Sequence, residues 1–170
     1  MCPPLNRSGT ALDGVGAVFG SRMYPMAVVT ARAGDAYGGC LVGFHTRCSI
    51  DPARYLVCLS SANRTWRVAN AAHALAVHFL AKADVELARL FGEVTGDDAD
   101  KFTRCEWSPG PFGLPILEHN GSWLAGPIVS RHMTGDHQAV VIDAVEGGGR
   151  LPGMPLQSSD VVDLRPGHPA

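Results

Sequence analysis

Short apolar runs, each ended by a turn-forming pair, constrain the fold of this chain more than any other feature. The longer runs are predicted strands over residues 24–31, 40–50, 55–60, 75–80, 122–133 and 138–145, and Ile116-Leu117 adds a short one. Turns are predicted at Gly34-Asp35, Gly38-Gly39 and Asp51-Pro52. About six strands with few helices between them favour a mainly β fold, an antiparallel barrel or sandwich.

Two short helices are predicted between the strands. Asn63 suits the N-cap of a helix from Arg64 to about Ala72. Residues 84–91 form an amphipathic segment, and Gly92 suits its end. Two helices are too few for a doubly wound sheet, and no Gly-x-Gly-x-x-Gly follows a predicted strand. A Rossmann-type dinucleotide site is therefore not expected.

Length and composition favour one globular domain. The chain has 170 residues, of which 46% are hydrophobic and 18% charged. We expect an N-terminal arm over 1–20 with one short helical turn, a domain over 21–148, and an extended tail over 149–170 that lies on the surface or on a partner. A net charge of −2 with scattered Lys and Arg argues against a nucleic-acid partner.

The sequence also bears on location and on metal chemistry. No apolar run approaches the ~20 residues that cross a bilayer, and the first residues lack the charged-then-apolar order of a signal peptide, so we expect a cytoplasmic protein without membrane partners. The five cysteines form no Cys-x-x-Cys pair, which argues against a zinc site. We interpret Cys40, Cys48 and Cys58 as small buried hydrophobic residues.

Ser60, Ser61, Asn63, Arg64 and Thr65 form the first candidate site. They follow a predicted strand and open a helix, where hydroxyls, backbone N–H groups and a guanidinium can bind a phosphate. The same residues also allow a simpler interpretation, in which Asn63 or Ser61 only caps the helix and Arg64 is solvated.

Two further segments carry candidate polar residues. Alternation along the strand 43–52 puts Phe44, Thr46, Cys48 and Ile50 on one face, and His45, Arg47 and Ser49 on the other, where a flat ligand could lie. Lys101 could approach a phosphate or a ribose. Each of these side chains could equally be an ordinary exposed polar residue.

The tight turn Gly135-Asp136 leaves His137 at the start of a strand. An imidazole there could donate a hydrogen bond, stack on a ring, or act as an acid or base near neutral pH. A surface histidine in a turn is the alternative. No Ser/His/Asp triad pattern and no acid/base carboxylate pair is evident, so hydrolysis and metal catalysis have little support.

Taken in order, these segments resemble the short-chain flavin reductase family. The resemblance runs from about Tyr24 to Glu146 and is carried by the following motifs: Ala27-Val-Val-Thr30, Ser49-Ile-Asp-Pro52, Ser60-Ser61, Asn63-Arg-Thr65, Lys101-Phe102, Gly113-Leu-Pro-Ile-Leu117 and Gly135-Asp-His137. It implies a six-stranded antiparallel Greek-key split β-barrel with two or three short helices. It also implies a homodimer with FMN (or FAD) near the subunit interface. Such enzymes take a hydride from NADH or NADPH and often supply reduced flavin to a partner monooxygenase.

The resemblance also assigns expected roles to residues. The flavin pocket would use Gly43, His45, Thr46, Arg47, Cys48 and Ser49 of the second strand, with Ser60 and Ser61 near the ring. Asn63, Arg64 and Thr65 would lie near the phosphate, with Lys101 as a further candidate there. Asp136 and His137 would border the nicotinamide, with His137 mainly a positioning residue in catalysis.

The second strand departs from the family pattern. The usual Asn-Ser-Phe-Thr corresponds here to Gly43-Phe44-His45-Thr46, so two polar contacts toward the flavin are lost or rebuilt. This departure keeps two alternatives open. One is a split-barrel protein that binds a flavin or haem-like ligand without NAD(P)H turnover, and the other is a protein that uses a deazaflavin.

Overall fold

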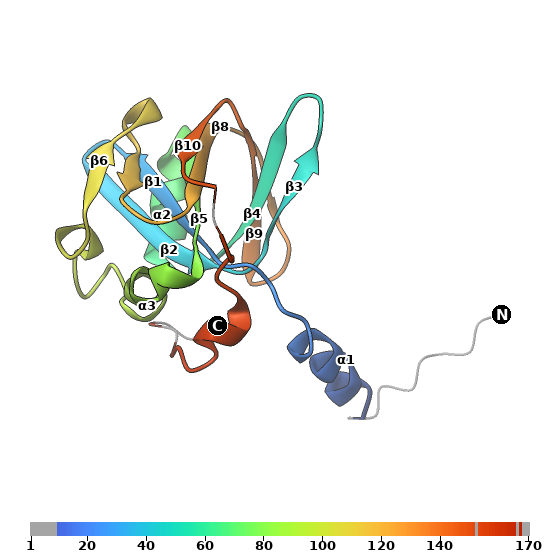
Figure 1. The fold of residues 1–170 in the computed structure, drawn as a ribbon. Helices are drawn as coiled ribbons and strands as arrows, with labels where there is room; N and C mark the ends of the chain where they lie inside the picture. Colours follow the sequence, from blue (N-terminus) through green and yellow to red (C-terminus); the bar gives the residue numbers. More distant parts are fainter. Residues whose placement is uncertain (1–9, 152, 166, 168–170) are drawn as a thin grey trace.

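The fold is a curled antiparallel β-sheet with three α-helices, as a computed structural model shows (Figure 1). The structure describes residues 10–151, 153–165 and 167. Cys2 and the first nine residues of the predicted N-terminal arm lie outside the described residues. The mainly β prediction is confirmed.

Eight strands make up the large sheet, with the order β2-β1-β5-β8-β9-β4-β3 and β10 paired to β8. Their bounds are β1 Ala27–Ala33, β2 Ala36–Val42, β3 His45–Ser49, β4 Arg54–Ser60, β5 Ala74–Phe79, β8 Ser122–Met133, β9 His137–Asp143 and β10 Glu146–Gly149. A separate two-stranded sheet joins β6 (Trp107–Pro109) to β7 (Pro115–Leu117).

The sheet therefore has more strands than the predicted six. The predicted strand 40–50 divides at Gly43-Phe44 into β2 and β3, which lie at opposite ends of the sheet order. The segment Glu146–Gly149, which ends in three glycines and has no apolar pattern, pairs with β8 as β10. Backbone pairing of this kind leaves no periodicity in the sequence.

The turn predicted at Gly38-Gly39 is wrong, because both glycines lie inside β2. A Cβ at Gly38 would lie 3.0 Å from Cβ of Val68, and a Cβ at Gly39 would overlap the ring of Phe91. The glycines thus mark places where a helix and an aromatic ring approach the strand closely.

A seam separates the two ends of the curled sheet. The chain itself crosses it at Gly43-Phe44, where the Phe44 carbonyl accepts a hydrogen bond from Cys58 N at 2.8 Å. Beyond that bond, the end of β4 pairs with β9 and not with β3, and Ser60 is registered opposite His137. The barrel is therefore closed at this point by a short length of chain and not by a strand ladder.

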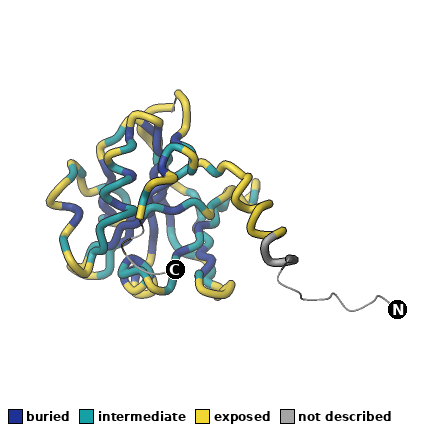
Figure 2. The backbone as a smooth tube through the Cα atoms, turned by 90° about the horizontal axis from the view of Figure 1, so that it is seen from below, coloured by how far each residue is buried: buried dark blue, intermediate teal, exposed yellow. Residues whose placement is uncertain are grey.

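The helices are α1 (Thr10–Gly20), α2 (Arg64–Ala71) and α3 (Val85–Glu93). Asn63 caps α2 as predicted, since its side-chain oxygen accepts from Thr65 N. Helix α1 is longer than the single turn predicted for the arm, and it projects from the sheet (Figures 1 and 2). Short 3₁₀ turns occur at Lys82–Asp84, Lys101–Thr103, Pro111–Gly113 and Ser158–Val161. No helix in the described ranges is long and apolar enough to cross a membrane.

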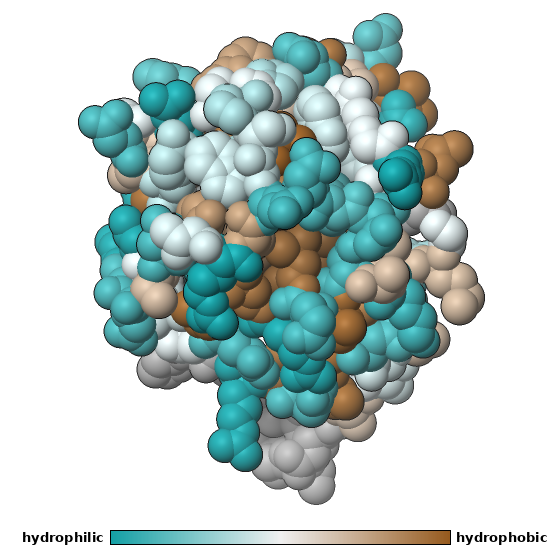
Figure 3. Space-filling view, turned by 60° about the vertical axis from the view of Figure 1, so that its left-hand side comes forward, coloured by the Kyte–Doolittle hydropathy of each residue, from teal (hydrophilic) through white to brown (hydrophobic). Residues whose placement is uncertain are grey.

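Strand β1 is covered on both faces, which explains its unbroken apolar run. Val29 packs inside the curled sheet with Val57 and Ile142, whereas Val28 packs on the outer face with Phe91. Helix α2 covers the inner core through Val68 and its neighbours, and α3 covers the outer one. On the face shown in Figure 3, apolar side chains gather in a hollow rimmed by hydrophilic ones.

Candidate active site at the seam

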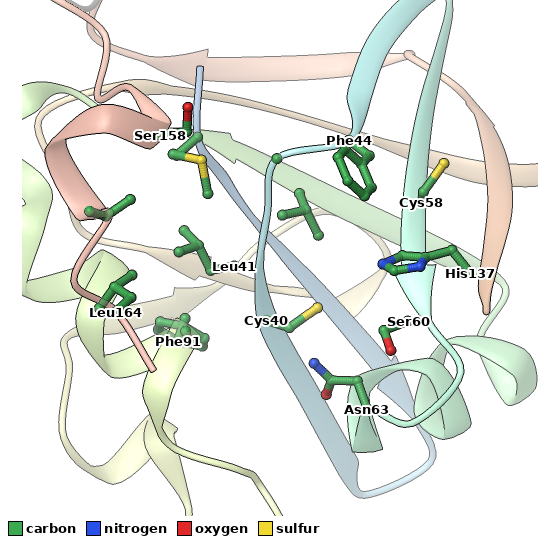
Figure 4. Close-up of a pocket in the computed structure, with 15 residues that line it drawn as sticks. Cys40, Leu41, Phe44, Cys58, Ser60, Asn63, Phe91, His137, Ser158 and Leu164 are labelled. Atoms are coloured by element: carbon green, nitrogen blue, oxygen red, sulfur yellow. The ribbon is translucent and has the colours of Figure 1, made fainter. Parts of the chain in front are cut away.

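A cavity of about 340 Å³ lies at the seam. It is lined from β2 by Cys40 to Val42, from the crossing by Gly43 and Phe44, and from the facing strands by Cys58, Ser60 and His137. Its volume is within the range of small-molecule sites in proteins. In Figure 4 the lining side chains form two groups, one on each side of β2.

One group forms a polar wall. Ser60 and His137 face each other across the β4–β9 ladder, and Asn63 stands at the start of α2 (Figure 4). The Asn63 side-chain oxygen is engaged by Thr65 N at 2.9 Å, which leaves the amide N–H groups to donate to a ligand. The wall therefore offers a hydroxyl and an amide donor at fixed positions.

His137 stands at the edge of this wall. Its Nδ1 lies 2.8 Å from Oδ1 of Asp136, and this hydrogen bond holds the pKa of the Asp136 carboxyl below its usual range. The Phe44 ring lies edge-on to the imidazole, with 5.4 Å between the centroids. Because the aspartate engages Nδ1, Nε2 is left for a molecule bound at the mouth of the cavity.

The other group forms an apolar wall, made by Met26, Leu41, Phe91, Val161 and Leu164, with Ser158 beside them (Figure 4). Three of the lining residues, Ser158, Val161 and Leu164, come from the segment after the sheet. The sequence predicts only an extended tail there, and nothing in its pattern indicated a part in the site.

A cationic region adjoins the cavity along β2. Arg64, Thr65 and Lys101 meet Gly38 and Gly39 there, directly beside Asn63 and Cys40 of the cavity. Arg64 donates a hydrogen bond to the Gly96 carbonyl. The space between these residues is about 10 Å³, which holds one water. A larger anion therefore requires Arg64 to turn away from Gly96.

Lys101 is the most unusual residue of this region. It is 4% exposed, and its Nζ donates to the Phe91 carbonyl at a long 3.4 Å. Within the described residues, its ammonium takes part in none of the ion pairs. Burial lowers the pKa of Lys101. Its ammonium also lies over the Phe91 ring, 5.3 Å from the centroid. A buried cation with one long hydrogen bond and one cation–π contact keeps N–H donors that an anion could accept from.

The predicted second-strand residues lie apart from the cavity, except for Gly43. His45 is bound by Tyr55 Oη at 2.7 Å and by the Pro25 carbonyl at 2.9 Å, and burial lowers its pKa. The next four residues, Thr46, Arg47, Cys48 and Ser49, belong to β3 in the hairpin that extends away from the seam (Figure 1). The side chain that enters the cavity here is Phe44.

Ser61 and Asp136 tie the rim of the polar wall together, because Ser61 N and Oγ both donate to the Asp136 carbonyl, each at 2.9 Å. Cys40, Cys48 and Cys58 were interpreted from the sequence only as buried hydrophobic residues. Cys40 is buried and Cys58 is half-buried, and both line the cavity, but the prediction is wrong for Cys48, which is exposed on β3. Cys58 precedes Ser60 by two residues on β4, so strand alternation could have placed it on the same side. Burial raises the pKa of the Cys40 thiol to about 11, which keeps it protonated.

Residues 19–157 match the family model described as flavin reductase like domain. The chain belongs to this family. The reductase subunit HsaB of a flavin-dependent monooxygenase from Mycobacterium tuberculosis is 27% identical over 138 residues, which are 81% of this chain and 72% of that protein. The resemblance to flavin reductases seen in the sequence is thereby confirmed.

Solved structures of this family share the fold. A flavin reductase domain protein from Arthrobacter sp. FB24 superposes with a TM-score of 0.78 at 24% identity, over 86% of this chain and 89% of that one. The NADH:FAD oxidoreductase SgcE6 of Streptomyces globisporus C-1027 gives a TM-score of 0.75 at 21% identity, over 87% and 88% of the two chains. At these identities the similarity describes the fold alone.

Proposed function

We propose that this flavin reductase family member takes a hydride from NADH or NADPH onto FMN or FAD, and supplies the reduced flavin to a flavin-dependent monooxygenase. The observation that carries the proposal is Lys101, a buried ammonium with one long hydrogen bond and no ion pair among the described residues, placed beside a cavity with a polar wall. The similarity to SgcE6, an NADH:FAD oxidoreductase, supports this reaction class, and the similarity to HsaB, a reductase subunit of a flavin-dependent monooxygenase, supports this kind of partner.

The residues present fit a flavin. The cavity offers donors on one wall and apolar side chains on the other, as a ring with polar and apolar edges requires. Lys101 and Arg64 would hold the phosphate, with Thr65 beside them, and Ser60 and Asn63 would orient the ring. The flavin supplies the redox chemistry itself, and the protein supplies binding and orientation.

His137 is the positioning residue for the nicotinamide in this proposal. Hydride transfer needs the two rings stacked at close range, and it needs no general acid. Phe44 and His137 present two rings at the mouth of the cavity, and Asp136 fixes the rotamer and tautomer of the imidazole. The residues of β3 have no role in binding the ring within one protomer.

A homodimer that acts in the cytoplasm completes the proposal. Large apolar side chains remain exposed on α1 and around the hairpin, among them Phe19, Phe44 and Ile50. A second copy that covers Phe44 would also enclose the mouth of the cavity. The four described cysteines are free, as is usual for a cytoplasmic protein.

The test is anaerobic reduction of the protein's flavin by NADH or NADPH. Purified protein should bind FMN or FAD, and the flavin absorbance should bleach on addition of the nicotinamide. His137→Ala should lower kcat/KM for the nicotinamide by about tenfold through lost positioning. His73→Ala, an exposed histidine outside the cavity, is the matched control and should not change the rate. Flavin binding without oxidation of either nicotinamide would instead indicate a binding protein, and absence of flavin binding would refute the proposal.

A further inference from the structure

We propose that residues 158–164, the C-terminal strap, retain bound flavin in the cavity, with Val161 and Leu164 closing its apolar wall. This inference rests on the proposed function, in which the flavin must leave the protein to reach a partner. The match to the family model ends at residue 157, directly before the strap.

The strap contacts the cavity through its apolar residues. Val161 is 6% exposed and packs in the same cluster as Phe91 and Leu156. Leu164 lies over Gly92 of α3, where an added Cβ would be 3.2 Å from Leu164 Cδ1 and 3.1 Å from Leu41 Cδ2. Removal of the strap would therefore open the apolar wall to solvent along the side of β2 that Leu41 faces (Figure 4).

The start of the strap is fixed to the sheet. Ser158 N donates to the Tyr24 carbonyl at 2.8 Å, and Ser158 Oγ accepts from Tyr24 N at 3.1 Å. Just before it, Leu156 is completely buried and bonds to both Met26 and Leu80 through the backbone. Movement of the strap would thus pivot at Ser158.

The remainder of the strap is held by side chains. Within the described residues, the backbone bonds of 159–164 are local, from Asp160 N to Gln157 O and from Leu164 N to Val161 O. Two ion pairs connect it to the rest of the fold, Lys82 to Asp160 at 2.9 Å and Arg89 to Asp163 at 2.8 Å. Two longer bonds add to them: Ser159 Oγ donates to Met23 Sδ at 3.5 Å, and just beyond the strap Gly167 N donates to the Gly92 carbonyl at 3.4 Å. Exposed ion pairs of this kind are weak and are screened by salt. The strap can therefore open without disruption of the sheet.

Dissociation of riboflavin, followed by its fluorescence after dilution, tests the proposal. Riboflavin lacks the phosphate, so the salt dependence of its release does not report on Lys101 or Arg64. The double variant Lys82→Gln/Asp163→Asn removes both ion pairs at exposed positions, and it leaves the cap that Asp160 gives to Gln157 N. It should release riboflavin about fivefold faster at low salt. In the wild type, added salt should speed release, whereas in the double variant it should not.

Leu164→Ala provides a second variant and Asp143→Asn the control. The first shortens the apolar wall and should speed release about tenfold at every salt concentration. Asp143→Asn breaks the Arg54–Asp143 ion pair, which is also 2.8 Å long. This pair lies at the end of the β4–β9 ladder that is remote from Ser60 and His137, so the release rate should not change. Unchanged release in both strap variants, with flavin bound, would overturn the role of the strap alone. Absence of flavin binding by the wild type would overturn the proposed function as well.

Discussion

His78 and Lys101 are both buried nitrogen bases, and their surroundings differ in one respect. His78 is fully buried, and both of its ring nitrogens have backbone partners: Nδ1 donates to the Val28 carbonyl, and Nε2 accepts from Leu117 N, each at 3.2 Å. Lys101 is almost as deeply buried, but its ammonium has one partner at 3.4 Å. A buried base with all its hydrogen bonds satisfied stabilises a fold, whereas one with unused donors is available to a ligand.

The two residues also differ in protonation and in what their hydrogen bonds do for the fold. Burial, together with the charge of His119, lowers the pKa of His78 to about 3, so the ring is neutral and joins β5 to β1 and β7. Among the described residues, Lys101 has no second hydrogen-bond partner in the fold, so loss of its proton would give it no further bond there. The proposed anion from outside would use the donors that remain.

The largest effect should be the loss of stability in acid. The pKa of His78 is about 3 in the folded protein, against an ordinary value of 6.5, so the unfolded chain binds the proton more readily. Stability from this residue is complete above pH 6.5 and falls as the pH drops toward 3. The total loss is roughly 5 kcal/mol. Urea unfolding at a series of pH values measures it, and a flat profile below pH 6.5 would contradict the assignment.

Replacement of His78 should be the next largest effect. His78→Leu leaves the Leu117 N–H without its acceptor in the core and removes the side-chain bond to the Val28 carbonyl, which should cost about 3 kcal/mol of unfolding free energy at pH 7. The variant should also lose most of the acid dependence. His132→Asn changes an exposed histidine and serves as the control, with stability within about 0.5 kcal/mol of the wild type.

Lys101→Met should keep the stability of the fold and weaken ligand binding, the opposite of what we expect for His78→Leu. Because a buried cation is removed, the unfolding free energy should stay level or rise. FMN should bind about thirtyfold more weakly through loss of a charge-assisted hydrogen bond, while riboflavin affinity should not change. Titration of both ligands by fluorescence separates the two results. Equal losses for FMN and riboflavin would remove Lys101 from the phosphate site.

Arg64→Gln should have the smallest effect in this series. Its guanidinium already donates to Gly96, so an anion gains it only after that bond breaks. FMN affinity should fall about threefold, again with riboflavin unchanged. A loss larger than that of Lys101→Met would reverse the ranking of the two cations and place the phosphate on the outer side of the region.

Much of the fold could be predicted because burial patterns dominate the strands. The runs that became β1, β4, β5 and β9 are apolar on the face or faces that the core covers, and Asn63 marks the start of α2 through local chemistry. The errors have physical causes that are not local. Gly38 and Gly39 indicated a turn because the sequence does not show the helix and ring that need their missing side chains.

The site was predicted best where its residues are contiguous. Ser60, Asn63 and Arg64 come from one strand-to-helix connection, and the resemblance brought His137 to them. Val161 and Leu164 could not be predicted, because their contact with β2 and α3 arises from tertiary packing between segments that are far apart in the sequence. His45 was assigned to the pocket, and its bonds to Tyr55 and Pro25 depend on the bend at Gly43, which alternation alone does not reveal.

The crossing at Gly43-Phe44 has a consequence for how such a protein can change. Strand ladders fix the spacing of their members at about 4.8 Å, so a cavity bounded by paired strands can be widened only by the loss of hydrogen bonds. Here the two-residue connector joins β2 to β3, and its Phe44 carbonyl accepts a hydrogen bond from Cys58 of β4, so the length of the connector sets the distance between β2 and β4. Insertion or deletion of a residue in that connector would change the size of the molecule that the cavity accepts, while the strand ladders stay intact. The connector is therefore a suitable position for laboratory evolution toward other planar ligands.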